Sequence, residues 1–147
     1  MLTDALLSYA HFAFVLILAG ALAAEAFILR LRVDARVALL LARVDAFYGI
    51  AAIGVIAAGF ARVYFGLKGA DFYFEQHWFW TKIALFVIVG LLSVPPTLQF
   101  FKWRKAARAD AGFVADEKQV KAVKRFIMIE LHVLALVPLA AAFMARG

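Results

Sequence analysis

Four long apolar segments, separated by short polar stretches, dominate the hydrophobic pattern of the chain. They cover about residues 5–29, 45–67, 79–101 and 123–145. About 20 apolar residues in an α-helix cross the roughly 30 Å of hydrocarbon in a bilayer. The pattern therefore predicts an all-α fold, an antiparallel four-helix transmembrane bundle, with residues 1–147 forming a single integral membrane domain.

The basic residues predict how this bundle is oriented. Twelve of the 16 Lys and Arg residues lie in or beside the first and third polar stretches. They are Arg30, Arg32, Arg36, Arg43, Lys102, Arg104, Lys105, Arg108, Lys118, Lys121, Lys124 and Arg125. Because basic loops stay in the cytoplasm, we expect a multi-pass protein of the bacterial inner membrane with both termini periplasmic. Residues 102–122 are basic enough to lie as an amphipathic segment on the inner surface, against anionic lipid or a docked protein.

Composition narrows the class of function. Hydrophobic residues make up 67% of the chain, against about half in a soluble domain. The absence of cysteine excludes disulfides, thiolate metal sites, iron–sulfur clusters and covalently attached c-type haem. In such a protein the net charge of +6 reports topology more than nucleic-acid binding. We therefore expect the lipid bilayer, and no nucleic acid, as a partner.

Three polar side chains are expected at similar depth near the end that carries the termini. By helical rise, His11, Arg62 and Lys82 lie about 9, 7 and 4 Å inside the ends of their segments. The boundary residues Tyr64 and Trp80 are close by in the sequence. Two cations without an acidic residue at that depth favour an anionic ligand, such as a carboxylate, a quinone oxygen or a haem propionate. Snorkelling of both cations to lipid phosphates, with His11 as a packing residue, is the alternative.

A second polar set, Glu25, Asp45 and Glu130, is expected nearer the basic stretches. Ionisable groups at membrane depth are costly and need partners. Arg30 or Arg43 could neutralise the first two carboxylates, and a proton relay is the alternative interpretation. One stripe of the second segment carries Asp45, Tyr48, Ala52, Val55, Gly59 and Arg62 at helical spacing, and we expect it to face the bundle interior.

The last two segments raise further questions. Glu130 and His132 lie about 200° apart around a helix, so we expect one to face a neighbouring helix and the other a second protomer, which makes a homo-oligomer a candidate assembly. Pro95–Pro96 predicts a bend or break in the third segment, either structural or opening a cavity. Small residues four apart, Gly20 with Ala24 and Gly54 with Ala58, predict close helix approach.

The first polar set suggests b-type haem as a cofactor. Histidine is a common axial ligand of haem iron. A pair of His11 and His132 fits poorly, because His132 lies about 21 Å from the outer end of its helix. His11 with the Lys82 amine as metal ligands, and Arg62 on a propionate, agrees better with the depths.

Motifs along nearly the whole chain resemble a family of small bacterial predicted membrane proteins of unknown function, which implies a four-span fold. The motifs are Tyr9-Ala10-His11, Ala19-Gly20, Asp45-Ala46-Phe47-Tyr48-Gly49, residues 62–69, Phe79-Trp80-Thr81-Lys82 and Ser93-Val94-Pro95-Pro96-Thr97.

The chain also resembles, more distantly, the HemJ-type membrane protoporphyrinogen oxidases. The resemblance is carried by His11, Ala19-Gly20 and Arg30 in and after the first segment and by Trp80-Thr81-Lys82 at the start of the third. It implies that His11 and Lys82 hold a b-type haem.

Three interpretations of function follow. The first is a b-type haem-binding oxidoreductase, acting on a porphyrinogen or transferring electrons to quinone. The second is a non-catalytic partner subunit of a larger membrane complex. The third is a small ion-coupled carrier, suggested by the proline pair and the buried carboxylates.

Overall fold

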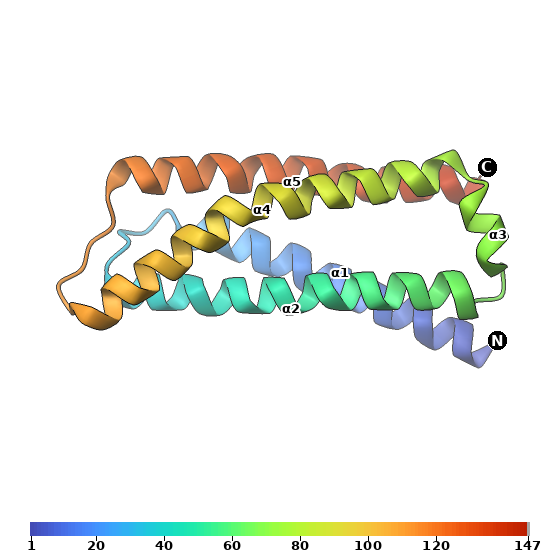
Figure 1. Ribbon diagram of the computed structural model, residues 1–147, viewed down its shortest axis with the longest axis horizontal. Helices are drawn as coiled ribbons and strands as arrows, with labels where there is room; N and C mark the ends of the chain where they lie inside the picture. The colour runs from blue at the N-terminus through green and yellow to red at the C-terminus, as the bar shows by residue number, and fades with distance from the viewer. Residues whose placement is uncertain (147) are drawn as a thin grey trace.

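Four long antiparallel helices and one short helix make up the computed structural model, which describes residues 1–146 (Figure 1). The helices are α1 (Leu2–Ile28), α2 (Ala35–Phe65), α3 (Gly69–Phe74), α4 (His77–Ala109) and α5 (Glu117–Arg146). The four long helices are each long and apolar enough to cross a membrane. No strand occurs in the described part of the chain. The predicted all-α antiparallel four-helix bundle is confirmed.

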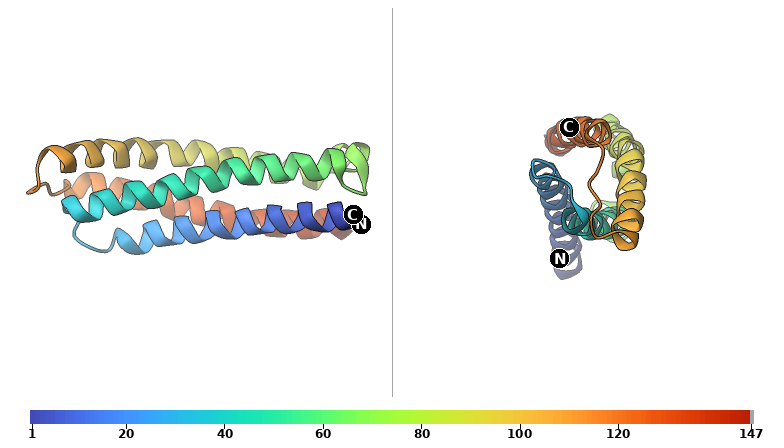
Figure 2. Two further views of the ribbon diagram at one scale, coloured as in Figure 1. Left: turned by 90° about the horizontal axis from the view of Figure 1, so that it is seen from below. Right: turned by 90° about the vertical axis from the view of Figure 1, so that its left-hand side faces the viewer.

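The long helices form a ring in the order α1, α2, α4, α5 (Figure 2). Both termini and α3 lie at one end, which we call the terminal end, and the turns at residues 29–34 and 110–116 lie at the other, the basic end. Helices α1 and α5 have the least contact of the neighbouring long helices. They diverge toward the terminal end, where the N- and C-termini stand well apart (Figures 1 and 2).

The helices extend further at the basic end than the apolar segments predicted. Helix α2 begins ten residues earlier, at Ala35, and its 31 residues span about 46 Å, more than the hydrocarbon thickness. Asp34 caps it, because its Oδ1 accepts a hydrogen bond of 2.9 Å from the Val37 amide. Helix α4 runs to Ala109, and α5 starts at Glu117. The separate amphipathic segment expected at residues 102–122 is therefore wrong, since most of it continues these two helices.

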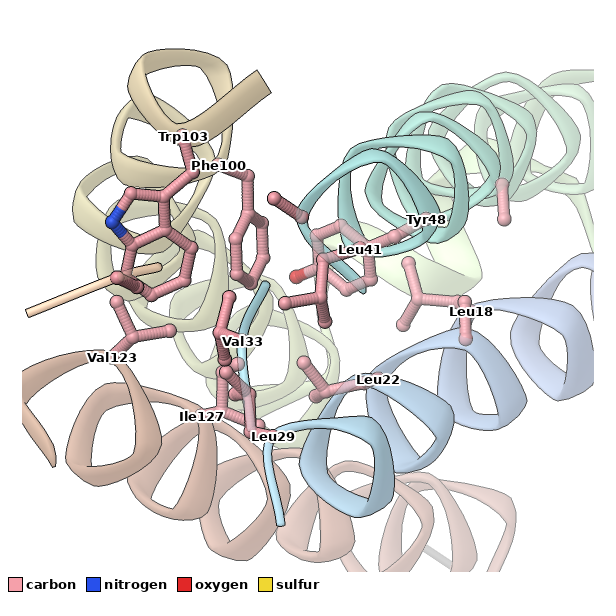
Figure 3. Close-up of a cluster of buried hydrophobic side chains, with 14 of the residues drawn as sticks. Leu18, Leu22, Leu29, Val33, Leu41, Tyr48, Phe100, Trp103, Val123 and Ile127 are labelled. Carbon is pink, nitrogen blue, oxygen red and sulfur yellow. The ribbon is translucent and has the colours of Figure 1, made fainter. Parts of the chain in front are cut away.

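The inner faces of these extensions explain why they pack together and do not lie on lipid. A cluster of buried side chains from all four long helices fills the basic end (Figure 3). In the extensions, Leu41 is 0% and Trp103 2% exposed, and they pack in one cluster with Phe100 and Ile127. The indole Nε1 of Trp103 donates a hydrogen bond of 3.1 Å to Gln119 Oε1. These apolar side chains lie along one side of helices whose other side is charged. Hydropathy averaged along the sequence therefore does not reveal the core that they form.

Two features predicted for the spans are realised differently in the structure. Helix α4 remains helical through Pro95 and Pro96 and changes direction along its length (Figure 1), which agrees with a bend and contradicts a break. Gly54 lies directly against the ring of Phe14, as close helix approach requires, whereas Gly20 has no heavy atom within 4 Å of the place a Cβ would take.

Helix α3 occupies part of the terminal-end connection, a stretch expected to be a loop. It begins at Gly69, whose φ of 76° favours glycine. Its aromatic residues pack onto the start of α4, with the Tyr73 and Phe79 ring centroids 5.7 Å apart. This short helix therefore covers the terminal end of the bundle between α2 and α4.

Candidate functional site

A cavity of about 490 Å³ lies within the bundle on the terminal-end side. All four long helices contribute to its walls, and Tyr73 adds a side chain from α3. Its lining is apolar except for His11, Arg62, Lys82 and the Tyr73 hydroxyl, and within residues 1–146 no acidic residue lines it. Both α1 and α5 line it, and these two helices diverge toward the terminal end (Figure 1). We call it the outer cavity.

His11 enters the outer cavity from α1 and packs over α2. Its ring lies on Gly59, where an added Cβ would be 3.3 Å from Cε1 and 3.5 Å from Nδ1. Glycine at position 59 leaves this space free for the His11 ring, because a side chain there would press on the imidazole. The imidazole also approaches the Val55 carbonyl, and its Nδ1 is buried without a hydrogen-bond partner. Within residues 1–146, one ring nitrogen of His11 is therefore buried without a partner, and the imidazole as a whole borders the cavity.

Arg62 and Lys82 bring two positive charges to the same cavity from α2 and α4. The Arg62 guanidinium carbon lies 5.7 Å from the centroid of the Phe12 ring, and Lys82 Nζ lies 5.8 Å from that of Phe79. Both are near His11. Arg62 Nε is buried without a hydrogen-bond partner. Aromatic faces stabilise cations only partly, and no side chain among residues 1–146 brings an anion to these two charges.

The structure separates the other two candidate residues from this group. Tyr64 and Trp80 are 59% and 52% exposed, and neither lines the outer cavity. The Trp80 Nε1 donates a hydrogen bond of 3.0 Å to the Phe74 carbonyl, and its ring stacks on Phe74 at a centroid distance of 6.0 Å. These contacts fix α3 against α4. Of the five candidate residues, the structure thus brings together His11, Arg62 and Lys82 only.

Several lining residues were missed by the sequence reasoning. Tyr73 and Phe79 are 7% and 3% exposed and close the terminal end of the outer cavity. Pro138 lines it from within α5. Because proline has no amide hydrogen, the Leu134 carbonyl loses its helical donor, which leaves a backbone acceptor on a helix that borders the cavity. A proline within an apolar segment is visible in the sequence, so Pro138 carries the same signal as Pro95 and Pro96.

The second polar set also comes together, on the basic-end side of the outer cavity. Glu25 and Glu130 are each 1% exposed, and Asp45 is 7% exposed. The Tyr48 hydroxyl donates a hydrogen bond of 3.2 Å to Glu130 Oε1. The polar stripe of α2 thus faces the interior over this stretch. The pairing with Arg30 or Arg43 is wrong for the described residues: Arg30 lies 5.1 Å from the centroid of the Phe27 ring and both arginines are exposed.

Glu130 and His132 face opposite ways, as their spacing predicted. Glu130 points into the bundle, whereas His132 is exposed on its outer side, with Nδ1 2.6 Å from the Met128 carbonyl. Because the Glu130 side chain is buried within a single chain, no second protomer is needed to shield it from lipid. Of the two residues, His132 is therefore the one on the side expected to face a second protomer, and a homo-oligomer stays a prediction.

The donor set of the outer cavity suits haem better than a bare metal ion. Within residues 1–146, no group of three His, Cys, Asp or Glu side chains is arranged to hold a metal ion. Haem iron, by contrast, takes only one or two axial ligands from the protein. The outer cavity offers the imidazole of His11 and the amine of Lys82 between apolar walls, and the Arg62 guanidinium is a group that pairs with carboxylates.

Comparison with known proteins identifies the family. A family model described as "Predicted membrane protein (DUF2214)" matches residues 3–147, so the chain belongs to this family, and the protein is an integral membrane protein. Neither the curated proteins nor the solved structures contain a match to the chain. These comparisons give no support to the resemblance to the HemJ-type oxidases.

Proposed function

We propose that this member of the DUF2214 family binds b-type haem in the outer cavity and acts as a redox protein of the membrane. The proposal is carried by one observation: an apolar cavity receives one imidazole and two cations from three helices, with no acidic residue among its lining residues in 1–146. Haem is a flat apolar ring with two carboxylates, and this combination of walls and charges matches it chemically.

Each polar residue has a role in this proposal. His11 and Lys82 would hold the haem iron, through an imidazole nitrogen and an amine. The Arg62 guanidinium binds a propionate, since its planar fork pairs with carboxylates in two places. When bound, haem supplies one-electron chemistry, with a quinone or a porphyrinogen as the reaction partner. The apolar walls exclude water from the ring.

The arrangement of the helices also suits an apolar ligand that arrives from the bilayer. Helices α1 and α5 diverge at the terminal end, and both line the outer cavity. A ligand dissolved in hydrocarbon can therefore enter sideways between them, while its carboxylates stay near the membrane surface. Tyr73 and Phe79 close the route from the terminal end.

Haem titration of the purified protein in detergent tests the assignment. We expect a Soret band that grows to one haem per chain. His11→Ala should weaken binding at least about tenfold, because loss of even an indirect support of a metal ligand has an effect of this size. Arg62→Gln removes a charge-assisted contact of about 1.5–3 kcal/mol, which is roughly ten- to a hundredfold in affinity.

Matched variants outside the cavity control for general damage. His132→Ala removes an exposed imidazole from α5, and Lys68→Met removes an exposed cation that lies 4.7 Å from the Phe72 ring centroid. Neither should change haem affinity, whereas Lys82→Met should alter the spectrum. If His11→Ala and Lys82→Met both bind haem like the unaltered protein, the axial-ligand assignment is wrong.

We also propose that the basic end faces the cytoplasm of a bacterial cell and the terminal end the periplasm. The charge asymmetry supports this orientation, since twelve of the 16 Lys and Arg residues lie toward the basic end. The chain has no cysteine, so single introduced cysteines give an unambiguous test. In intact cells a membrane-impermeant thiol reagent should label Lys68→Cys and not Ala111→Cys. The reverse pattern would mean the opposite orientation.

A further inference from the structure

The three carboxyl groups on the basic-end side of the outer cavity are not used by the proposed haem site. Glu25 comes from α1, Asp45 from α2 and Glu130 from α5. The first two lie close together, and Glu130 is near both. Two of the three are 1% exposed. The lipid-spanning helices thus hold three acidic side chains in their common interior.

The hydrogen bonds made by this group are incomplete. The Tyr48 hydroxyl donates to one oxygen of Glu130 at 3.2 Å. The other oxygen, Glu130 Oε2, is buried without a partner, and so is Glu25 Oε1. A buried ionised carboxylate needs several donors or a counter-ion. Two orphaned oxygens in the same interior show that the chain itself does not satisfy these groups.

None of the side chains described around the group brings a positive charge to it. Facing side chains from α4 are the hydroxyls of Ser93 and Thr97. The cations of the outer cavity are distant, since Asp45 and Arg62 are 17 residues apart on α2, or about 25 Å. Toward the basic end, the next side chains in the interior are apolar: Leu41, Phe100 and Ile127, which belong to the buried cluster drawn in Figure 3.

Three negative charges at this place would repel one another in a medium of low dielectric constant. Carboxyls that share a buried site do not all ionise; they keep protons and titrate as a coupled group. A proton on Glu25 turns its orphaned oxygen into a donor for a neighbouring carboxylate. Protonation of these carboxyls therefore removes the unbalanced negative charge and also supplies the missing hydrogen-bond donors.

We propose that Glu25, Asp45 and Glu130, with Tyr48, form a proton-binding site inside the bundle that holds at least two protons at neutral pH. The site adjoins the outer cavity on its basic-end side, because Leu131, the residue after Glu130, lines that cavity. It is thus placed to release protons to, or accept them from, a reaction partner bound in the outer cavity. The proposal does not depend on haem, because it rests on other residues.

Infrared spectroscopy of the purified protein in D₂O and H₂O at neutral pH tests the site. Carboxyls in contact with water are ionised at this pH, so a carbonyl band of protonated carboxylic acid reports buried groups. We expect such a band in the unaltered protein, with a shift in D₂O that shows proton exchange. Glu25→Gln and Glu130→Gln should each remove part of it. Glu75→Gln and Glu117→Gln, at exposed positions, should leave it unchanged.

The unaltered protein alone can overturn the proposal, so the result does not depend on whether the variants fold. Absence of the band at neutral pH would show that the carboxyls are ionised and that another cation balances them. A band that persists undiminished in both Glu25→Gln and Glu130→Gln would assign the protons to other groups. Either result refutes this site, and neither bears on haem binding.

Discussion

Alanine at Gly54 should destabilise the bundle, whereas alanine at Gly49 on the same helix should not. A Cβ at Gly54 would meet the ring of Phe14 on α1, with Cγ and Cε1 both at 2.6 Å. At Gly49 no heavy atom lies within 4 Å of the corresponding place. The two substitutions are chemically identical and lie in the same α-helix, so their difference isolates the contact between α1 and α2.

The size of this difference follows from two terms. Alanine is favoured over glycine inside a helix by about 0.8–1 kcal/mol, and this gain is common to both positions. Only Gly54→Ala adds the strain of inserting a methyl group into a packed contact, about 1–3 kcal/mol. The free energy of unfolding of Gly54→Ala should therefore be about 1–3 kcal/mol lower than that of Gly49→Ala.

Reversible unfolding of the detergent-solubilised protein by SDS, followed by circular dichroism, measures the difference. In a Phe14→Ala background the ring is gone, and the two glycine substitutions should then have equal effects, as in a double-mutant cycle. Equal stability of Gly54→Ala and Gly49→Ala with Phe14 in place would refute the described α1–α2 contact. That contact also fixes the position of α1 along the bundle axis, and with it the depth of His11, which lies one turn from Phe14.

Two further substitutions test other contacts of the bundle. Tyr48→Phe removes the donor to Glu130 Oε1 and should lower the free energy of unfolding by about 0.5–1.5 kcal/mol. The same SDS titration measures this loss. An unchanged free energy of unfolding would mean that the hydrogen bond is not formed. Asp34→Ala removes the cap of the Val37 amide and should cost about 1 kcal/mol. Thermal unfolding should show this loss for Asp34→Ala and not for Asp71→Ala, which removes an exposed carboxylate that caps no helix.

The number and direction of the spanning helices could be predicted because hydrocarbon imposes a length on each apolar run. The extent of the helices at the basic end could not. Leu41, Trp103 and Ala107 lie among lysines and arginines, which lower the mean hydropathy, although these three side chains are buried. The charged residues on one face of each helix lower the averaged hydropathy, so the buried apolar residues on the other face are not recognised from it.

Part of the candidate site followed from helical rise alone. Depth grouped His11, Arg62 and Lys82 correctly, because straight helices of known pitch carry residues to calculable heights. It also grouped Tyr64 and Trp80 with them, since depth contains no information about which face of a helix looks inward. The contributions of Tyr73 and Pro138 depend on how α3 folds over the bundle and on where α5 diverges from α1. These are properties of tertiary packing and cannot be read from one segment.

The visible absorption spectrum of the protein, purified from the membranes of cells supplied with haem, tests the central claim most directly. The spectrum is recorded oxidised and then after reduction with dithionite. A Soret band, with α and β bands that sharpen on reduction, is the result expected for haem held by His11 in the outer cavity. A well-folded protein that shows no such bands, and takes up no haem when titrated with it, would contradict the claim and leave Arg62 and Lys82 as cations without the proposed ligand.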